Sequence, residues 1–213
     1  MSTHLVLQVM VVSGGKGVPR NIMDEFGYSS SDSNVLFNDA PLKKLDTSEC
    51  SFFKNHGMSY PHVGNGLLAR PLERSDYDKG YLDLLSQLTK VGNYSKIKYE
   101  TQFDSMKQMS GCHYIVVIED TAQSMVVASA TLVVEKKFIH GAVNRGRIED
   151  VVVDKDHRKL RLGSFLLELM TTLSRELGCY KVTLDCKADV EGFYTKFGYI
   201  NEGQLFLSKR YFD

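Results

Sequence analysis

The sequence has no excess of charge, few cysteines and no long hydrophobic run, and each absence excludes a class of protein. Lys plus Arg and Asp plus Glu both number 26 among 213 residues, so no overall field favours nucleic acid or an anionic membrane as a partner. No apolar stretch approaches the ~20 residues that span a bilayer. The length predicts one domain, or one domain with an extension, and it is sufficient for a sizeable core.

The four cysteines, Cys50, Cys112, Cys179 and Cys186, show no CxxC spacing and no metal pattern. They are expected to be free thiols in a reducing compartment, with a disulfide between two chains as the alternative. Residues 4–12 resemble a signal-peptide core but lack a basic flank and a following A-x-A-like site. We expect a cytoplasmic protein without a metal, and the alternatives are secretion or association with an endomembrane surface.

Residues 1–66 are weakly patterned and predict a partly flexible extension ahead of a domain at residues 67–213. Ser13-Gly-Gly-Lys-Gly17 resembles a phosphate loop, but no Ser or Thr follows the lysine, so it is interpreted as a linker. Two apolar pieces, residues 35–37 and 52–53, are expected to pack onto the domain as arms.

Apolar periodicity in the domain predicts an α/β (α+β) fold with the order β-α-α-β-β-β-α-β-α-β. Pro71 makes the first strand, residues 66–72, an edge strand. Ser75 caps a helix that Gly92 ends, and a second helix covers residues 99–110 with Phe103, Met106 and Met109 inward. The remaining predicted strands are 113–119, 124–136, 148–153, 180–186 and 200–210, with a short helix over residues 190–197.

The chain is organised around residues 147–178. A β-branched run, Ile148 to Val153, predicts a strand that is nearly all buried. A charged turn and an amphipathic helix follow, with its apolar stripe at Leu166, Leu169, Met170, Leu173 and Leu177, and with Gly178 as its left-handed end. The unpaired amides at the start of this helix, Gly163 and the nearby basic residues together suit a phosphate or pyrophosphate. An ordinary solvated corner is the alternative.

The junction Arg158-x-x-Arg161-x-Gly163-Ser164 resembles the acyl-CoA signature of the GNAT family of N-acetyltransferases, Q/R-x-x-G-x-G/A, with Arg161 in place of the first glycine. Residues 137–151, 178–186 and 192–199 are similar to members of this family that acetylate an amino-sugar phosphate. The resemblance begins near residue 67 and continues to the C-terminus. It implies the GNAT fold, a mixed and mostly antiparallel sheet that is flanked by helices and splayed at the acyl-CoA site.

The resemblance implies acetyl-CoA as co-substrate, with the pyrophosphate on the amides of residues 159–164 and the thioester along the valine-rich strand. The implied cofactor-binding residues are Val151, Val152, Val153, Arg158, Lys159, Leu160, Arg161, Leu162, Gly163, Ser164, Asp185 and Tyr194.

Acetyl transfer to an amine needs a polarised carbonyl, a neutral amine and stabilisation of the leaving thiolate. By resemblance Tyr194 is the thiolate-facing catalytic tyrosine, although its spacing between two phenylalanines also fits a core aromatic. Glu149 and Asp150 are the catalytic carboxylates, expected on opposite faces of the strand. The identity of the general base stays open between them and water.

The resemblance implies the following substrate-binding residues: Thr89, Lys137, Phe138, Ile139, His140, Glu149, Asp150, Val151, Tyr180, Lys181 and Arg210. We assign the phosphate to Lys181 and Arg210, because a guanidinium binds phosphate bidentately. A solvated strand end is the alternative for both. The resemblance also implies a homodimer in which the C-terminal strand pairs with the other chain, so that each active site uses both chains.

The implied activity is direct transfer of the acetyl group of acetyl-CoA to the amine of glucosamine 6-phosphate, a step toward UDP-N-acetylglucosamine. One alternative is an acetyltransferase for another amine, in a protein or a polyamine, but the cationic residues favour a phosphate. The other is a non-catalytic acyl-CoA-binding module, which only the departure at Arg161 supports.

Overall fold

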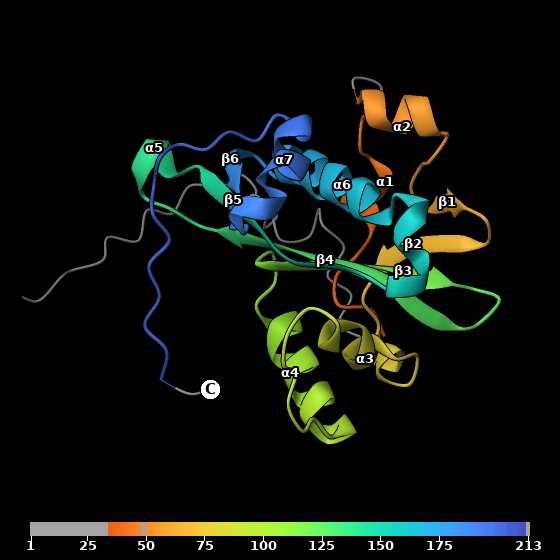
Figure 1. The fold of residues 1–213 in the computed structure, drawn as a ribbon. Coiled ribbons are helices and arrows are strands. Elements are labelled where there is room, and N and C mark those ends of the chain that lie inside the picture. Colours follow the sequence, from red (N-terminus) through yellow and green to blue (C-terminus); the bar gives the residue numbers. More distant parts are fainter. Residues whose placement is uncertain (1–33, 48–49, 212–213) are drawn as a thin grey trace, which may run out of the picture. The chain divides into compact units, whose positions relative to one another are not determined.

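A computed structural model describes residues 34–47 and 50–211 (Figure 1). The chain divides into two units, residues 1–32 and residues 33–213. The first unit lies outside the described residues, and so do the predicted linker at residues 13–17 and the apolar run at residues 4–12. Among the described residues, no helix combines the length and the apolar character needed to cross a membrane.

The second unit is built on one six-stranded sheet whose strands lie in chain order. Its first five strands are antiparallel neighbours and the sixth is parallel to the fifth, which confirms the predicted hairpin and βαβ unit. The strands are β1 (His62–Gly64), β2 (Leu67–Pro71), β3 (His113–Asp120), β4 (Met125–Glu135), β5 (Asn144–Val153) and β6 (Cys179–Thr183).

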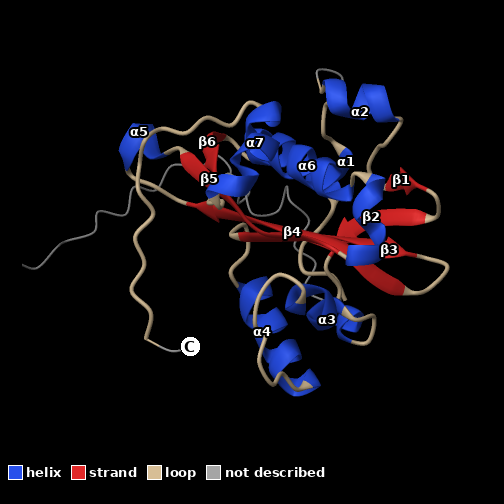
Figure 2. Ribbon diagram, viewed as in Figure 1, coloured by secondary structure: helices blue, strands red, loops and turns tan. Residues whose placement is uncertain are grey.

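Helices cover both faces of this sheet (Figure 2). The α-helices are α1 (Ala40–Lys43), α2 (Ser51–His56), α3 (Tyr81–Ser86), α4 (Lys96–Gln108), α5 (Ile139–Ala142), α6 (Leu162–Glu176) and α7 (Glu191–Tyr194). Short 3-10 helices are η2 (Arg74–Tyr77), η3 (Lys155–Leu160), η4 (Ala188–Val190) and η5 (Thr195–Phe197).

The predicted stripe of α6 forms the core on one face of the sheet. Its residues Leu166, Leu169, Met170 and Leu173 are fully buried, and each such side chain contributes about 1.5–3 kcal/mol by leaving water. Leu177, the last residue of the stripe, follows the helix and is only partly buried. Gly178 follows the helix with φ +71°, as expected for a left-handed end. On the same face Phe53 of α2 packs edge-on against Phe165, their ring centroids 5.6 Å apart. The segment before residue 67 therefore contributes to this core.

The opposite face is covered by α3 and α4, which bury Tyr81, Leu84, Tyr99 and Phe103 against β3 and β4. Two details of the prediction were wrong here. The helix expected after Ser75 is broken into η2 and α3, because Gly80 adopts a left-handed φ of +79° between them. Met109 follows α4 and is exposed.

The predicted edge strand and last strand were also wrong. The three-residue β1 pairs with β2 and takes the edge position, and so short a strand carries no detectable period. Residues 200–210 form no strand in the described part of the chain, and Leu205 and Phe206 are 87% and 68% exposed. A strand requires a hydrogen-bonding partner, and this segment finds none of the sheet's strands beside it.

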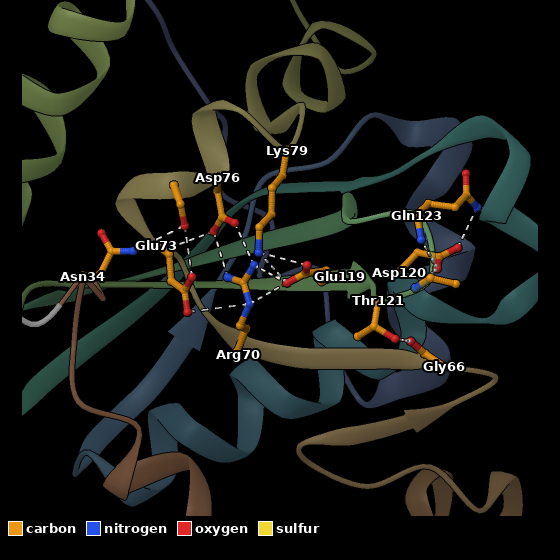
Figure 3. Close-up of polar contacts among 12 residues, drawn as sticks. Asn34, Gly66, Arg70, Glu73, Asp76, Lys79, Glu119, Asp120, Thr121 and Gln123 are labelled. Atoms are coloured by element: carbon orange, nitrogen blue, oxygen red, sulfur yellow. Dashed lines mark hydrogen bonds and ion pairs between the residues drawn. The ribbon is translucent and has the colours of Figure 1, made fainter.

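A buried ionic cluster holds the segment before α3 against the sheet (Figure 3). Arg70 of β2 donates to both carboxylate oxygens of Asp76 at 2.8 and 2.7 Å, and to Glu119 of β3 at 2.6 Å. Lys79 donates to the other oxygen of Glu119 at 2.9 Å. Burial acts to raise the pKa of Glu119, but the two cations outweigh it and lower that pKa.

Candidate active site

The centre of the candidate site is a β-bulge in β5. Thr131 pairs with Glu149 and Ser129 with Val152, so Asp150 and Val151 lie opposite the single residue Ala130. Asp150 has a positive φ of +52°. The regular alternation assumed for Glu149 and Asp150 is therefore wrong at this point. The expectation of a nearly all-buried strand was also wrong, because Ile148 and Val152 are buried while the residues between them are partly or fully exposed.

The sheet also opens on the other side of β5. Within the described residues β6 pairs with β5 only at Asn144, Gly146 and Arg147. Beyond Arg147 the strand has no β6 partner, so residues 148–153 have a free edge beside the bulge. This is the splay that the sequence resemblance implied.

The predicted phosphate junction lies at the end of this free edge. The charged turn forms η3, which is followed directly by Arg161 and the first turn of α6. A Cβ on Gly163 would lie 3.6 Å from Val153 Cγ2, so the first turn of α6 packs closely on β5. The side chains of Arg158 and Lys159 are exposed, whereas Leu162 is buried. The first amides of α6 have no partner within the helix and are available to an anion.

Arg161 occupies the left-handed conformation that the glycine of the family signature would favour, with φ +59° and ψ +21°. The turn therefore keeps its shape in spite of the substitution, at a conformational cost. Replacing Arg161 by glycine is expected to raise the free energy of unfolding by up to about 1 kcal/mol, net of the extra chain entropy of glycine. Urea denaturation measures this change.

The control is Arg158→Gly, which removes a neighbouring cation from η3, where no left-handed strain is relieved, and should lower stability. Stabilisation by both substitutions, or by neither, would contradict the assignment of strain to Arg161.

Arg147 joins two of the predicted carboxylates, although the sequence prediction did not include it. Its Nε donates to Glu149 Oε1 at 2.5 Å, and its Nη2 donates to Asp185. The hydrogen bond to Glu149 and the charge of Asp185 raise the pKa of Arg147 against partial desolvation. Desolvation, and then the charge of Glu149, raise the pKa of Asp150. Arg147 and Glu149 are two residues apart on one strand, a spacing that signals a shared face.

Tyr194 lies half-buried on α7, with its ring centroid 5.1 Å from that of Phe193 and 6.3 Å from that of Tyr199. Burial, and to a smaller extent the thiol of Cys186, raise the pKa of the phenol. The hydroxyl is therefore protonated at neutral pH and is a potential proton donor.

The predicted substrate residues are only partly brought together. The rings of His140 and Tyr180 are in contact in a tilted arrangement, with centroids 4.4 Å apart, and Lys181 pairs with Glu202 at 3.1 Å. Lys137 forms an ion pair with Glu135. The other predicted residues in this group whose exposed side chains have no described polar partner are Thr89, Phe138, Ile139 and Arg210.

A cavity of about 470 Å³ lies between α6, β6 and residues 196–198, and Lys181 is the one predicted site residue among those that line it. The candidate site is therefore an open surface along β5 and not this cavity.

The described residues contain no group of three or more His, Cys, Asp or Glu side chains placed to hold a metal. Tyr81 of α3 is buried in the core on the other face of the sheet, and burial, with a smaller effect from the charge of Asp150, raises the pKa of its phenol.

Comparison with known proteins places these features in context. The model of the "Acetyltransferase (GNAT) family" matches residues 80–199, which is more than half of the chain. A Drosophila melanogaster protein named "Probable glucosamine 6-phosphate N-acetyltransferase" is 47% identical over 131 residues, covering 62% of this chain and 59% of that protein. The match thus spans less than two thirds of the fly protein.

The glucosamine 6-phosphate N-acetyltransferase of Arabidopsis thaliana is 38% identical over 144 residues, covering 68% of this chain and 95% of that protein. The crystal structure of glucosamine-6-phosphate N-acetyltransferase from Arabidopsis thaliana is similar to this fold, with a TM-score of 0.66 and 35% identity. It covers 68% of this chain and 98% of the crystallised chain.

Proposed function

The chain belongs to the acetyltransferase (GNAT) family, and from this premise we propose that it transfers the acetyl group of acetyl-CoA to the amine of glucosamine 6-phosphate. The products are N-acetylglucosamine 6-phosphate and CoA. The observation that carries the proposal is the free, bulged edge of β5 beside the first turn of α6. This geometry fits a thioester lying along the strand with its nucleotide end at the helix.

Backbone amides hold acetyl-CoA in this arrangement. The amides of residues 159–164 bind the pyrophosphate, with Gly163 allowing close approach, and Arg158, Lys159 and Arg161 add positive charge. The backbone of Val151, Val152 and Val153 faces the pantetheine arm and the acetyl carbonyl. Leu160 and Leu162 contribute their amides, since Leu162 is buried and Leu160 packs against the core.

The transfer is direct, within a ternary complex. The pKa values of Cys179 and Cys186 are raised by burial, which disfavours the thiolate that a covalent acetyl-enzyme would need. Arg147 holds Glu149 and Asp185 toward one another, which suits them to orient the sugar amine. Asp150, with its raised pKa, accepts the amine proton directly or through a water. Tyr194 donates to the departing sulfur.

A coupled assay of thiol release tests the reaction. Purified protein with acetyl-CoA is expected to release CoA with glucosamine 6-phosphate far faster than with glucosamine or spermidine. Equal turnover of phosphorylated and unphosphorylated glucosamine would remove the sugar phosphate from the assignment. Turnover of spermidine alone would favour a polyamine acetyltransferase, and CoA binding without turnover would favour a binding module.

The active form in this proposal is a homodimer whose sites use both chains. Residues 200–211 lie exposed and carry several large apolar side chains, among them Ile200, Leu205, Leu207 and Tyr211. Such a segment is stabilised by pairing with a strand edge of a second chain. Arg210 then reaches across to the other chain's site and binds the phosphate of the sugar there. Lys181 is the second cation assigned to this phosphate.

Replacing Arg210 by alanine is expected to raise the KM for glucosamine 6-phosphate by about tenfold, because a charge-assisted phosphate contact is lost. The KM for acetyl-CoA should stay within about twofold, since no CoA contact is assigned to this residue. Steady-state kinetics with each substrate varied separately measure both values. An unaltered sugar-phosphate KM would move the phosphate pocket elsewhere.

Lys209→Ala is the control, because it removes the adjacent exposed cation. Co-expression of Arg210→Ala with Tyr194→Phe extends the test to the dimer. If Arg210 serves the other chain's site, each mixed dimer places both substitutions in one site and leaves the other intact. Activity well above that of either variant alone is then expected, and no recovery would contradict a shared site.

A further inference from the structure

One exposed side chain joins α3 to the residue that begins the phosphate junction. Gln87 ends α3, and both ends of its amide are used. Its Nε2 donates to Asp154 Oδ2 at 2.7 Å, and its Oε1 accepts from the backbone amide of Lys155 at 3.0 Å. Gln87 is exposed and contributes nothing to either core. In the described structure, the polar contacts between Gln87 and residues outside α3 are these two hydrogen bonds.

Asp154 is in turn the anchor of η3. Its Oδ1 accepts from the Asp156 amide at 3.0 Å and lies 2.9 Å from His157 Nδ1. The backbone amide of Asp154 donates to Val127 of β4 at 2.8 Å. Three short contacts and the amide of Gln87 therefore converge on one residue between β5 and η3.

A second anchor lies one turn along η3. His157 Nε2 is 3.8 Å from Asp120 Oδ2 at the end of β3. Asp120 is itself fixed by its own turn, where it accepts from the Gln123 side chain at 2.7 Å and from the Ala122 amide at 3.0 Å (Figure 3). The side chains of His157 and Asp120 are each 14% exposed, so this anchor is largely shielded.

These anchors determine where the phosphate-binding amides lie. η3 is six residues long, and its end at Leu160 leads through Arg161 straight into α6. The helix side of the junction is fixed by the core, whereas η3 has no fully buried side chain and packs on the core only through the partly buried Leu160 at its end. The position of the amides of residues 159–161 therefore depends on the polar anchors at Asp154 and His157 as well as on Leu160.

We propose that Gln87 is a positioning residue for acetyl-CoA, which holds Asp154 and Lys155 so that the amides at the end of η3 meet the pyrophosphate. This inference rests on the proposed function, because it assumes that the junction binds CoA. The hydrogen bonds of Asp154, with that from Gln87 foremost, outweigh desolvation and lower its pKa to about 2. The carboxylate is thus charged in any assay near neutral pH, and hydrogen bonds to a charged acceptor are the strong kind.

The test compares Gln87→Glu and Gln87→Ala by calorimetry with CoA and by steady-state kinetics. Gln87→Glu places a carboxylate against Asp154, and Gln87→Ala removes both hydrogen bonds. Both are expected to raise the Kd for CoA and the KM for acetyl-CoA by at least about fivefold, which is the scale of one typical net hydrogen bond. The KM for glucosamine 6-phosphate should change by less than about twofold, since the assigned sugar contacts are elsewhere.

Two controls separate positioning from a general loss of structure. Gln102→Ala removes an exposed glutamine of α4 that has no described hydrogen bond to η3. It should leave the Kd for CoA and both KM values unchanged. The double variant Gln87→Glu with Asp154→Asn exchanges the two partners, so the pair re-forms with the amide on the other side. It is expected to recover most of the CoA affinity that Gln87→Glu loses.

The outcomes distinguish the two proposals. An unmodified chain that binds no CoA overturns the proposed function and the role of Gln87 together. Normal CoA binding by the unmodified chain with an unchanged Kd in both Gln87 variants overturns the role of Gln87 alone. Equal increases in the KM for both substrates, without rescue by the exchanged pair, would also overturn it.

Discussion

Replacing Tyr194 by phenylalanine is expected to lower kcat by about 100-fold while leaving the Kd for CoA within about twofold. The substitution keeps the ring and its contacts with Phe193 and Tyr199 and removes only the hydroxyl. A general acid contributes about 10²–10⁴ in rate, because the leaving thiolate otherwise departs without a proton. The ring packing predicts that CoA binding and folding survive.

Kinetics at saturating substrate, with calorimetry for CoA, measure the two quantities. Tyr199→Phe is the matched control. Tyr199 is also partly buried on the same side of the sheet, and its hydroxyl lies 2.6 Å from that of Thr171. Its loss should reduce stability by about 1 kcal/mol with little change in kcat. An unchanged kcat in Tyr194→Phe would exclude Tyr194 as the proton donor.

The pH dependence has a definite sign. Burial raises the pKa of Tyr194 above its ordinary value near 10. The phenol is thus protonated below that pH, and its contribution to kcat is lost only as the pH rises through the raised pKa. The ratio of kcat between the unmodified chain and Tyr194→Phe should therefore stay constant from pH 6 to pH 9.

Replacing Arg70 by methionine is expected to lower the free energy of unfolding by about 3–5 kcal/mol. This is the largest change in stability that we expect from any of the single substitutions considered. Asp76 is fully buried and Glu119 nearly so, and Arg70 is the guanidinium that binds both. Methionine fills a similar volume but leaves a buried carboxylate without its cation. Lys79 still pairs with Glu119, so the main loss falls on Asp76.

Urea denaturation followed by circular dichroism gives the difference in unfolding free energy. Arg74→Met is the control, because Arg74 pairs with Asp104 where the side chains are 34% and 48% exposed. Exposed ion pairs of this kind contribute up to about 1 kcal/mol. Similar losses from the two substitutions would show that burial does not set the energy of the Arg70 cluster.

The sequence alone determined what depends on near neighbours along the chain. The stripe of α6 repeats within two turns, and the hairpin of β3 and β4 is joined by a short polar turn, so both patterns are local. The junction at Arg158 to Ser164 was equally accessible, because a buried strand, a charged turn and a helix start occur in sequence. Even the strained residue was visible as an arginine where a glycine is typical, although its left-handed conformation was not.

Tertiary structure decided everything that depends on which distant segments meet. Arg70 and Glu119 are 49 residues apart, and Gln87 and Asp154 are 67 apart; no local pattern identifies such partners. The bulge at Asp150 appears only once β4 is aligned beside β5. Residues 200–210 were predicted to form a strand yet form none within the described part of the chain, because apolar residues indicate which side chains favour burial, whereas a strand exists only where another edge supplies its hydrogen bonds.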